Sequence, residues 1–442
     1  MFFNIIILLN AGLLNAIDSS LFVKEEVPVA NLNLVEEQDF VQSAFICSLK
    51  FLGKKAEGGD CQVFNYVNTT ESCFLGSFSE NDKSDKDNST QLVWKQRGCP
   101  VPEDPEHGRW NCLKNIKQEK CFLVCSPGYV AQSYRGLYCN HGANAEWDKP
   151  LDEFKCLPTI IAVTGGLLSP TNKQFYTFGP NGQRLYTQGI TQQTRQHVVQ
   201  YFSGKITYCG GDPKAGWINT GCYYYDFDLG GQKSEVTLQE RRQESTSVIV
   251  QDRYYMIGGS DIGSRRTAEY LLEGDLVSKV GMATPEWNDF SCAIRFSDRS
   301  FIVIGKDIVT EYDIISGIGK DLPKLNIPRQ KFGCSSFLDV DGEEVFIVAG
   351  GNSAGSKRST EIFKPSVGTW TVIGELNYER NSHAVVTTSD GVYAIGNKLN
   401  NKEKVEKLDI ETKTWNDTGL FFQASHTFAN AITAIPISIL PP

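Results

Sequence analysis

The chain has few histidines, no run of basic residues and no long stretch rich in alanine, glutamate, lysine and leucine. Its 442 residues include 52 acidic and 43 basic side chains, for a net charge of −9, and only five histidines. An acidic chain without basic runs repels a phosphate backbone, so we do not expect a nucleic-acid partner. The missing helical stretches and the abundant Tyr, Phe, Gly and Val favour a mainly β structure.

The N-terminus lacks the length and the flanking charges of a membrane span. An apolar run from Phe2 to Leu14 is followed by the small residue Ala16 and then by acidic residues rather than lysines. This pattern predicts a secretory signal peptide over residues 1–16. The apolar C-terminal stretch AITAIPISILPP is also too short to span and lacks the polar spacer of a lipid-anchor signal. We therefore expect a secreted, extracellular protein without a membrane span.

Cysteines and sequons agree with export. Thirteen cysteines in an exported chain imply disulfides, and the odd number leaves at least one cysteine over. Three sequons predict glycosylation at Asn68, Asn88 and Asn416. The charged stretch from Glu80 to Thr90 is typical of a solvated loop or linker.

A repeat occupies the C-terminal two thirds of the chain. Short apolar strands ending in glycine recur six times, as IIAVTGG, KITYCGG, YYMIGGS, FIVIGK, FIVAGG and VYAIGN, at intervals of 45 to 48 residues. A strand-like run lies upstream of these glycines and another lies downstream, so each unit holds several antiparallel strands. Units of this length pack radially as the blades of a β-propeller. The glycines are expected in turns that need positive φ; they are Gly165, Gly166, Gly210, Gly211, Gly258, Gly259, Gly305, Gly350, Gly351 and Gly396.

This pattern resembles the kelch repeat, in which a Gly-Gly doublet follows the second strand and a Tyr and a Trp come later in the blade. The doublet is intact at four sites and reduced to Gly305-Lys306 and Gly396-Asn397 at two; Trp370, Trp415, Tyr270 and Tyr312 match the later aromatic positions. The resemblance covers residues 157–442 and implies a six-bladed kelch-type β-propeller. The spare strand HTFANAITAIPISIL would complete the first blade, which has no upstream strand of its own, and would remove two exposed edges.

Residues 99–156 carry six cysteines, a Cys-x-x-Gly-Tyr sequence at Cys125 and a late Trp147. They resemble a sushi (complement control) module, whose framework implies the disulfides Cys99–Cys139 and Cys125–Cys156. Cys112 and Cys121 are extra to that framework, and we expect them to pair with each other. So short a domain has a small core and needs such cross-links. A zinc site is the alternative, which an oxidising compartment disfavours.

Residues 17–98 contain SAFICSLKF and CQVFNYVNTTESCFL, which resemble a PAN/apple module, a helix tied to a hairpin. The family framework would match Cys47, Cys61 and Cys73. Ser43 stands where the family usually has a helix cysteine, whose partner would be Cys73. The resemblance therefore leaves Cys47 and Cys61 as disulfide cysteines and Cys73 as the odd thiol, available for a disulfide-linked oligomer.

The stretch GGNSAGSK also matches two enzyme motifs. Ser353 lies in a G-x-S-x-G sequence, the nucleophile elbow of serine hydrolases, and the same residues nearly match a phosphate loop. Both motifs require a following helix, whereas STEIFKPSVGTW is interrupted by Pro365 and is not helical. We therefore predict that Ser353 is a turn residue and that no catalytic residue lies here.

Four residues raise the question of a metal site. Cys292, His197 and His383 each lie 13 residues before their glycine, and Cys334 lies 16 before its own. All four are thus expected on innermost strands that line the axial channel, where two His and two Cys could bind zinc or copper, although packing is the more economical explanation. Secreted kelch propellers include copper radical oxidases similar to galactose oxidase, but no closely spaced histidine pair is present. Cys209 and Cys222 flank one hairpin, as a local disulfide or as two buried thiols.

All three resemblances are to families that bind proteins or glycans, and no catalytic group or cofactor site remains. The sequence therefore predicts a mainly β, secreted binding or adhesion glycoprotein, with extracellular protein or glycan ligands. The binding surfaces would be the blade-connecting loops and the mouth of the channel, because loops on a rigid scaffold carry recognition. We expect no nucleic-acid partner and no membrane span. The alternative is a secreted copper-dependent oxidase on a kelch propeller, similar to galactose oxidase.

Overall fold

The computed structural model is mainly β, and it divides into two compact units. The first unit comprises residues 1–103, 110–121 and 136–151, and the second comprises residues 104–109, 122–135 and 152–442. In the described part of the chain there is no α-helix, only 3-10 turns, and no helix long and apolar enough to cross a membrane. The structure describes residues 22–28, 32–38, 63–67, 72–78, 90–96, 99–115, 118–140, 145–164, 175–179, 181–186, 197–211, 220–259, 267–272, 277–281, 291–353, 355–396, 403–422 and 432–441.

The first unit contains two antiparallel sheets. The five-stranded sheet has the order β1-β5-β3-β4-β2, and the four-stranded sheet has the order β10-β9-β7-β6. Cys99–Cys139 and Cys112–Cys121 are disulfides of this unit. The strands are β1 (Phe22–Pro28), β2 (Leu32–Gln38), β3 (Val63–Val67), β4 (Ser72–Phe78), β5 (Thr90–Gln96), β6 (Gly108–Asn115), β7 (Gln118–Cys125), β9 (Leu137–Asn140) and β10 (Glu146–Trp147).

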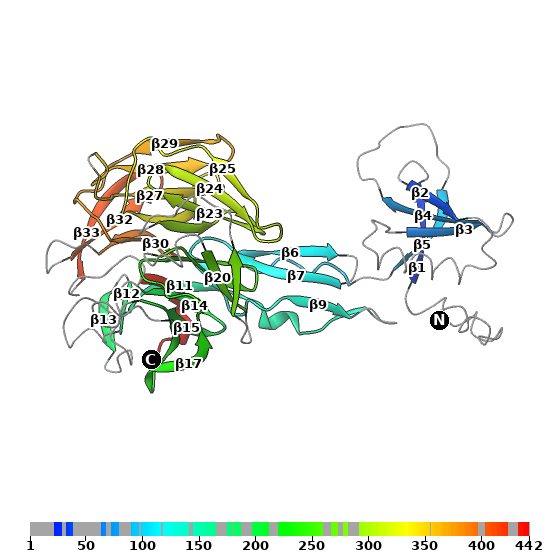
Figure 1. The fold of residues 1–442 in the computed structure, drawn as a ribbon, viewed down its shortest axis with the longest axis horizontal. Coiled ribbons are helices and arrows are strands. Elements are labelled where there is room, and N and C mark those ends of the chain that lie inside the picture. Colours follow the sequence, from blue (N-terminus) through cyan, green and yellow to red (C-terminus); the bar gives the residue numbers. More distant parts are fainter. Residues whose placement is uncertain are drawn as a thin grey trace. The chain divides into compact units, whose positions relative to one another are not determined.

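The second unit holds six antiparallel sheets, five of them formed by four consecutive strands (Figure 1). The first of these sheets, sheet I, is completed by the last strand, β34 (Ile432–Pro436), which pairs with β11 (Cys156–Thr164) from Val163 to Thr159, as the spare C-terminal strand predicts. A short strand, β8 (Tyr129–Ala131), pairs with the start of β11. A 3-10 turn, η3 (Leu151–Glu153), precedes β11 in the chain, and another, η5 (Ile437–Ile439), follows β34.

Sheet I consists of β13 (Gly182–Tyr186), β12 (Phe175–Gly179), β11 (Cys156–Thr164) and β34 (Ile432–Pro436); sheet II of β14 (Val198–Phe202), β15 (Lys205–Cys209), β16 (Gly221–Asp226) and β17 (Gly230–Thr237); sheet III of β18 (Thr246–Val250), β19 (Arg253–Ile257), β20 (Thr267–Leu272) and β21 (Val277–Gly281). Sheet IV consists of β22 (Cys292–Arg295), β23 (Ser300–Gly305), β24 (Ile308–Asp313) and β25 (Gly319–Leu322); sheet V of β26 (Gly333–Leu338), β27 (Glu344–Ala349), β28 (Thr360–Lys364) and β29 (Thr369–Ile373); sheet VI of β30 (Ala384–Thr388), β31 (Gly391–Ile395), β32 (Glu403–Asp409) and β33 (Thr414–Phe422).

The burial of these strands follows their place in the sheet. In β27 the residues from Val345 to Ala349 are all buried, whereas in β29 only Trp370 is buried. A strand covered on both faces needs a continuous apolar run, and an outer strand needs apolar residues on one face only. The apolar runs before the glycines are therefore the second strands of the sheets, which the sequence predicts.

Among the described residues of the second unit, six hydrophobic clusters each lie between two sheets. Sheets I and II share one cluster, II and III the next, and so on through V and VI. A sixth cluster joins sheet VI to sheet I through residues such as Ile161, Tyr393 and Ile432. Strands β34, β14, β18, β22, β26 and β30 also contact each other in this order, and β30 contacts β34. Burial of apolar surface therefore joins each sheet to two neighbours.

The glycine doublets lie at points of close approach between neighbouring sheets. The N–H of Gly351 donates to the carbonyl of Arg380 at 2.8 Å, and Gly211 donates in the same way to Arg242 at 2.7 Å. A Cβ on Gly350, at φ +65°, would lie 2.6 Å from the His383 ring. Positive φ is also found at Gly210, Gly211, Gly258, Gly259, Gly351 and Gly396.

Gly305 departs from this pattern, so the prediction of positive φ is wrong there. The left-handed residue is instead Lys306, at φ +57°, and a Cβ on Gly305 would meet nothing closer than 4.0 Å. Gly165 and Gly166 lie outside the described residues.

Three sheets contain a fully buried arginine–glutamate ion pair. Arg242 pairs with Glu269 at 3.2 Å, Arg329 with Glu361 at 2.6 Å and Arg380 with Glu406 at 2.8 Å. Each arginine also donates to the carbonyl of its own sheet's first glycine: Gly258, Gly350 or Gly396. Burial lowers the pKa of Arg242 and Arg329, and the carboxylates counteract that effect.

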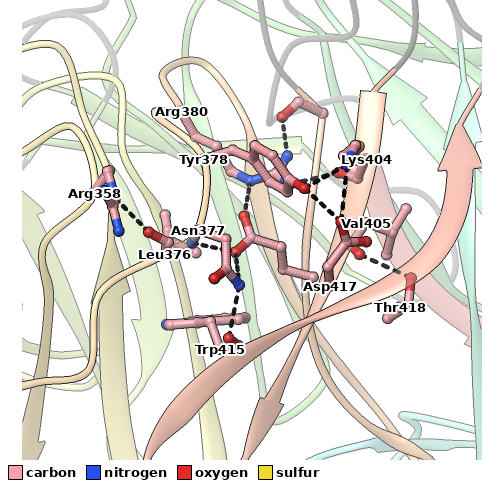
Figure 2. A network of polar contacts seen from close by, with 12 residues as sticks. Arg358, Leu376, Asn377, Tyr378, Arg380, Lys404, Val405, Trp415, Asp417 and Thr418 are labelled. Atoms are coloured by element: carbon pink, nitrogen blue, oxygen red, sulfur yellow. Dashed lines mark hydrogen bonds and ion pairs between the residues drawn. The ribbon is translucent and has the colours of Figure 1, made fainter.

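The Arg380 site shows how such a pair is connected to the surface (Figure 2). Asn377 donates its backbone N–H to Glu406 and its side-chain amide to the carbonyl of Trp415. Beside them, Tyr378 donates its hydroxyl to Asp417 at 2.5 Å, and Lys404 donates to Tyr378. Polar groups at the start of sheet VI are therefore held by a continuous network.

Candidate functional site

The second unit encloses a cavity of about 340 Å³ along the first strands of its sheets. Its walls come from β14, β18, β22, β26, β30 and β34, and the segment 123–134 contributes further residues. A volume of this size lies at the lower end of the range found for small-molecule sites in proteins. The cavity is therefore the strongest candidate for a ligand site among the described residues.

Uncharged hydroxyl and amide side chains form much of the lining of this cavity. Thr433 donates to the Gln200 carbonyl oxygen at 3.1 Å, and Gln200 donates to Ser247 at 3.4 Å. Ser335 and Thr387 share a hydrogen bond of 2.8 Å between neighbouring strands. These groups keep further donor and acceptor capacity, because each hydroxyl and amide can form more than one hydrogen bond.

The cavity is lined by three charged residues, Arg295, Asp298 and Lys331, and the first two form ion pairs. Arg295 bonds Glu344 at 3.4 Å and the carbonyl of Cys125 at 3.3 Å. Asp298 accepts two hydrogen bonds from Arg109, at 2.6 and 2.5 Å, and Asp298 is the main reason that the pKa of Arg109 is raised. These contacts tie residues 104–109 and 122–135 to the end of β22, so the cavity presents mainly neutral polar groups to a ligand.

Ser382 stands out among the lining residues. Its side chain is 3% exposed, and its hydroxyl has no hydrogen-bond partner within the described residues. Its backbone is left-handed, with φ +53°, and its N–H donates to the carbonyl of Lys331 at 2.7 Å. An unsatisfied buried hydroxyl and a left-handed non-glycine residue are both unfavourable, and they coincide here at the cavity wall.

The four residues considered as metal ligands do not form a metal site. Cys292 and Cys334 line the cavity, but they form a disulfide between β22 and β26. His197 and His383 are fully buried outside the lining, so the expectation that they line the channel is wrong. Within the described ranges, no group of three or more His, Cys, Asp or Glu residues is placed to hold a metal ion.

The two histidines have packing roles instead. His197 hydrogen-bonds Thr164 of sheet I at 2.7 Å through its Nε2. His383 packs against Gly350 of sheet V. Burial lowers the pKa of His383 well below 6.5, and the charges of Arg380 and Arg329 lower it further, so its ring is neutral at physiological pH.

Cys292, His197 and His383 all lie 13 residues before the glycine of their repeat, but this equal spacing does not give them equivalent positions in the sheets. Cys292 pairs with Ile304, the residue before its glycine, whereas the residue pairing at that level in sheet II is Val198, not His197. Cys292 lies 12 residues before its partner Ile304, whereas Val198 lies 11 before its partner Cys209, so the register relative to the glycine differs by one. Aligning the strands on their turns would have placed Cys292 near Cys334 at the cavity and would have suggested the disulfide.

Ser353 lies in a turn, as predicted. The carbonyl of Ser353 accepts hydrogen bonds from the N–H of Ser356, at 3.0 Å, and from its hydroxyl, at 2.8 Å. The next regular element is strand β28 and not a helix. The geometry of a nucleophile elbow or a phosphate loop is therefore not formed at this position.

Of the remaining sequence-predicted residues, some are described by the structure and the others lie outside the described ranges. Cys125–Cys156 and Cys209–Cys222 are disulfides, the latter between directly opposed residues of β15 and β16. Asn416 is exposed on β33, where its sequon would be accessible. Asn68, Asn88, Cys47 and Cys61 lie outside the described residues, and Cys73 is described only by its backbone in β4.

Comparison with known proteins adds no relative from which a role could be transferred. No protein-family model matches the chain, and no curated protein matches it. The functional argument therefore depends on the residues and on the geometry described above.

Proposed function

We propose that the six sheets of the second unit form a six-bladed kelch-type propeller and that the protein is a secreted glycoprotein that binds an extracellular partner. The observation that carries the fold is the arrangement of the six hydrophobic clusters, the last of which is shared by sheets VI and I. Radial packing is the arrangement in which each sheet meets two neighbours and the first strands surround a common cavity.

The disulfides support an extracellular location. Five disulfides occur among the described residues, and two of them lie within the repeat itself. Disulfides persist in oxidising compartments and are rare in the cytosol. Together with the signal-peptide pattern and the exposed sequon at Asn416, they favour a secreted glycoprotein with sushi-like and PAN-like modules before the propeller.

Exposed apolar side chains at the turns favour a protein partner. Ile315 and Ile318 are 63% and 69% exposed between β24 and β25, and Val340 and Val367 are 64% and 62% exposed on the two turns of sheet V. In an antiparallel sheet of four strands, the turns after the first and third strands lie at the same end. Apolar residues that gather at one end of a rigid scaffold are typical of a contact surface.

The test is retention of the purified, secreted protein on an extracellular-matrix extract from its own organism. We expect specific retention that falls in the variant Ile315→Ser/Ile318→Ser and persists in Val372→Ser, a matched control at a half-exposed strand position. Copper and zinc are measured on the same sample. Absence of retention contradicts the binding function, and retention that Ile315→Ser/Ile318→Ser leaves unchanged contradicts the contact surface at these turns. About one copper per chain would instead support the oxidase alternative.

A further inference from the structure

We propose that the cavity along the first strands binds a small, uncharged polyhydroxy molecule, such as a monosaccharide or a polyol, with Ser382 as one of its hydrogen-bonding contacts. This site is separate from the exposed turns through which the protein would bind a macromolecular partner. The two functions can therefore fail independently.

The unsatisfied hydroxyl of Ser382 is the first support. Buried polar groups in folded proteins nearly always have partners, and an exception needs a physical reason. Ser382 is buried, lines the cavity and has no partner for its hydroxyl within the described residues. A hydroxyl group of a bound ligand would supply that partner.

The backbone at Ser382 is the second support. Lys331 and Glu244 occupy the equivalent position in sheets V and III, two residues after the buried arginine, and have φ of +55° and +56°. Glycine would adopt this conformation without strain, yet side chains are kept at all three positions. Lys331 and Ser382 both line the cavity and Glu244 does not, so at two of the three positions the left-handed residue places a side chain where it can reach a ligand.

The lining decides the class of ligand. Gln200, Ser247, Ser335, Thr387 and Thr433 offer both donors and acceptors without a net charge. The charges of Arg295 and Asp298 are already matched by Glu344 and Arg109. Lys331 adds one further charge to the lining, but the hydroxyl and amide groups outnumber the charged side chains, so a neutral polyhydroxy compound matches the lining better than a charged ligand does.

The experiment titrates the full-length protein with glucose, galactose, N-acetylglucosamine and myo-inositol, and with the charged relatives glucuronate and glucosamine. Binding is followed by ligand-detected NMR, and stability by thermal unfolding of the same samples. We expect at least one neutral compound to bind and the charged relatives to bind more weakly. Ser382→Ala should weaken that binding by about five- to tenfold, the effect of one lost hydrogen bond.

Two further variants separate binding from folding. Ser382→Ala should leave the melting temperature unchanged or higher, because it removes an unsatisfied buried hydroxyl. Ser356→Ala is the matched control, since its buried hydroxyl donates to Ser353 outside the cavity lining; it should lower the melting temperature and leave binding intact. Ser335→Ala/Thr387→Val removes both partners of one cavity hydrogen bond, which is the mildest way to make the lining less polar.

Three results would overturn the proposal. Binding of none of the neutral compounds would mean that the cavity holds only solvent. Tighter binding of a charged relative would refute the class of ligand. Equal affinity in the wild type, Ser382→Ala and Ser335→Ala/Thr387→Val would place the binding elsewhere on the protein.

Discussion

Replacing Glu361 with glutamine tests how the buried ion pairs contribute to the fold. The Glu361 carboxylate accepts Arg329 Nη2 at 2.6 Å and the backbone N–H groups of Asn326 and Ile327 at 2.8 and 3.1 Å. Glutamine has nearly the same volume, but it removes the negative charge and replaces one acceptor oxygen with an NH₂ group, which cannot accept a hydrogen bond from these donors. Removing one partner of a buried pair costs about 3–5 kcal/mol. Carbonyls of Gly350 and Ser359 still accept Arg329, so we expect the lower end, about 3 kcal/mol.

The matched control is Thr310→Val in sheet IV. Thr310 pairs with Val303, and Glu361 pairs with Val348. Both valines lie two residues before the glycine of their sheet, so Thr310 and Glu361 occupy equivalent positions. Its hydroxyl forms one hydrogen bond of 3.2 Å, to Asp321. Because Asp321 is exposed and can bond water instead, we expect a cost of about 1 kcal/mol or less.

The assay is equilibrium urea unfolding of the full-length protein with its disulfides intact, followed by circular dichroism and by tryptophan fluorescence. A large chain can unfold in several steps, so the comparison uses the transition in which both probes change together. The double variant Arg329→Met/Glu361→Met should remain destabilised, because the two backbone N–H groups lose their acceptor. A cost below about 1 kcal/mol for Glu361→Gln would refute the reasoning.

Three other predictions follow from the same contacts. Burial and the charges of Arg380 and Arg329 lower the pKa of His383, so the unfolded chain binds a proton there near pH 6.5 while the folded chain does not. The contribution of His383 to stability is therefore complete above pH 6.5 and is lost as the pH falls, by up to about 1.4 kcal/mol per pH unit. His383→Gln should reduce this dependence of the urea midpoint on pH. Gly351→Ala should cost about 2 kcal/mol or more, because φ is +134° and the added Cβ would lie 2.9 Å from Gln330 O; Gly355→Ala, at φ +84° in open space, should cost less in the same assay. Cys292→Ser/Cys334→Ser should lower the melting temperature of the oxidised protein by more than it lowers that of a sample treated with reductant; equal losses would show that the bond contributes nothing.

The sequence reveals the sheets better than it reveals the cavity. The apolar runs before the glycines predict the second strands, because a strand covered on both faces must be continuously apolar. The spare C-terminal strand predicts the pairing of β34 with β11. The cavity is different, since its polar lining comes from single residues such as Gln200, Ser335 and Thr433 on strands far apart in the chain. Which of these side chains meet depends on turn lengths and register, and a difference of one residue between two hairpins was enough to place His197 wrongly in the lining.

Ser382 shows the same limit at a single residue. Its sequence neighbours, Asn381 and His383, give no sign that its hydroxyl is unsatisfied or that its backbone is left-handed. Serine is common at surface turns, and that is the ordinary interpretation of such a position. Only the burial of the side chain and the absence of a partner among the described residues distinguish it from a turn residue.

The glycine doublets and the buried arginines are connected by hydrogen bonds that link neighbouring sheets. The carbonyl of Arg380 accepts Gly351 of sheet V, while its guanidinium donates to Gly396 of its own sheet VI; Arg242 connects Gly211 of sheet II to Gly258 of sheet III in the same way. Each such arginine therefore bonds the glycines of two consecutive sheets, and the carboxylate stabilises its buried charge. Where the doublet is reduced to Gly305-Lys306, the link to sheet V is a different one, from the N–H of Arg329 to the carbonyl of Lys306. In that same sheet Thr310 replaces the glutamate, whereas sheet VI keeps Glu406 although its doublet is reduced to Gly396-Asn397. The acidic residue therefore accompanies the buried arginine of its own sheet rather than the complete doublet.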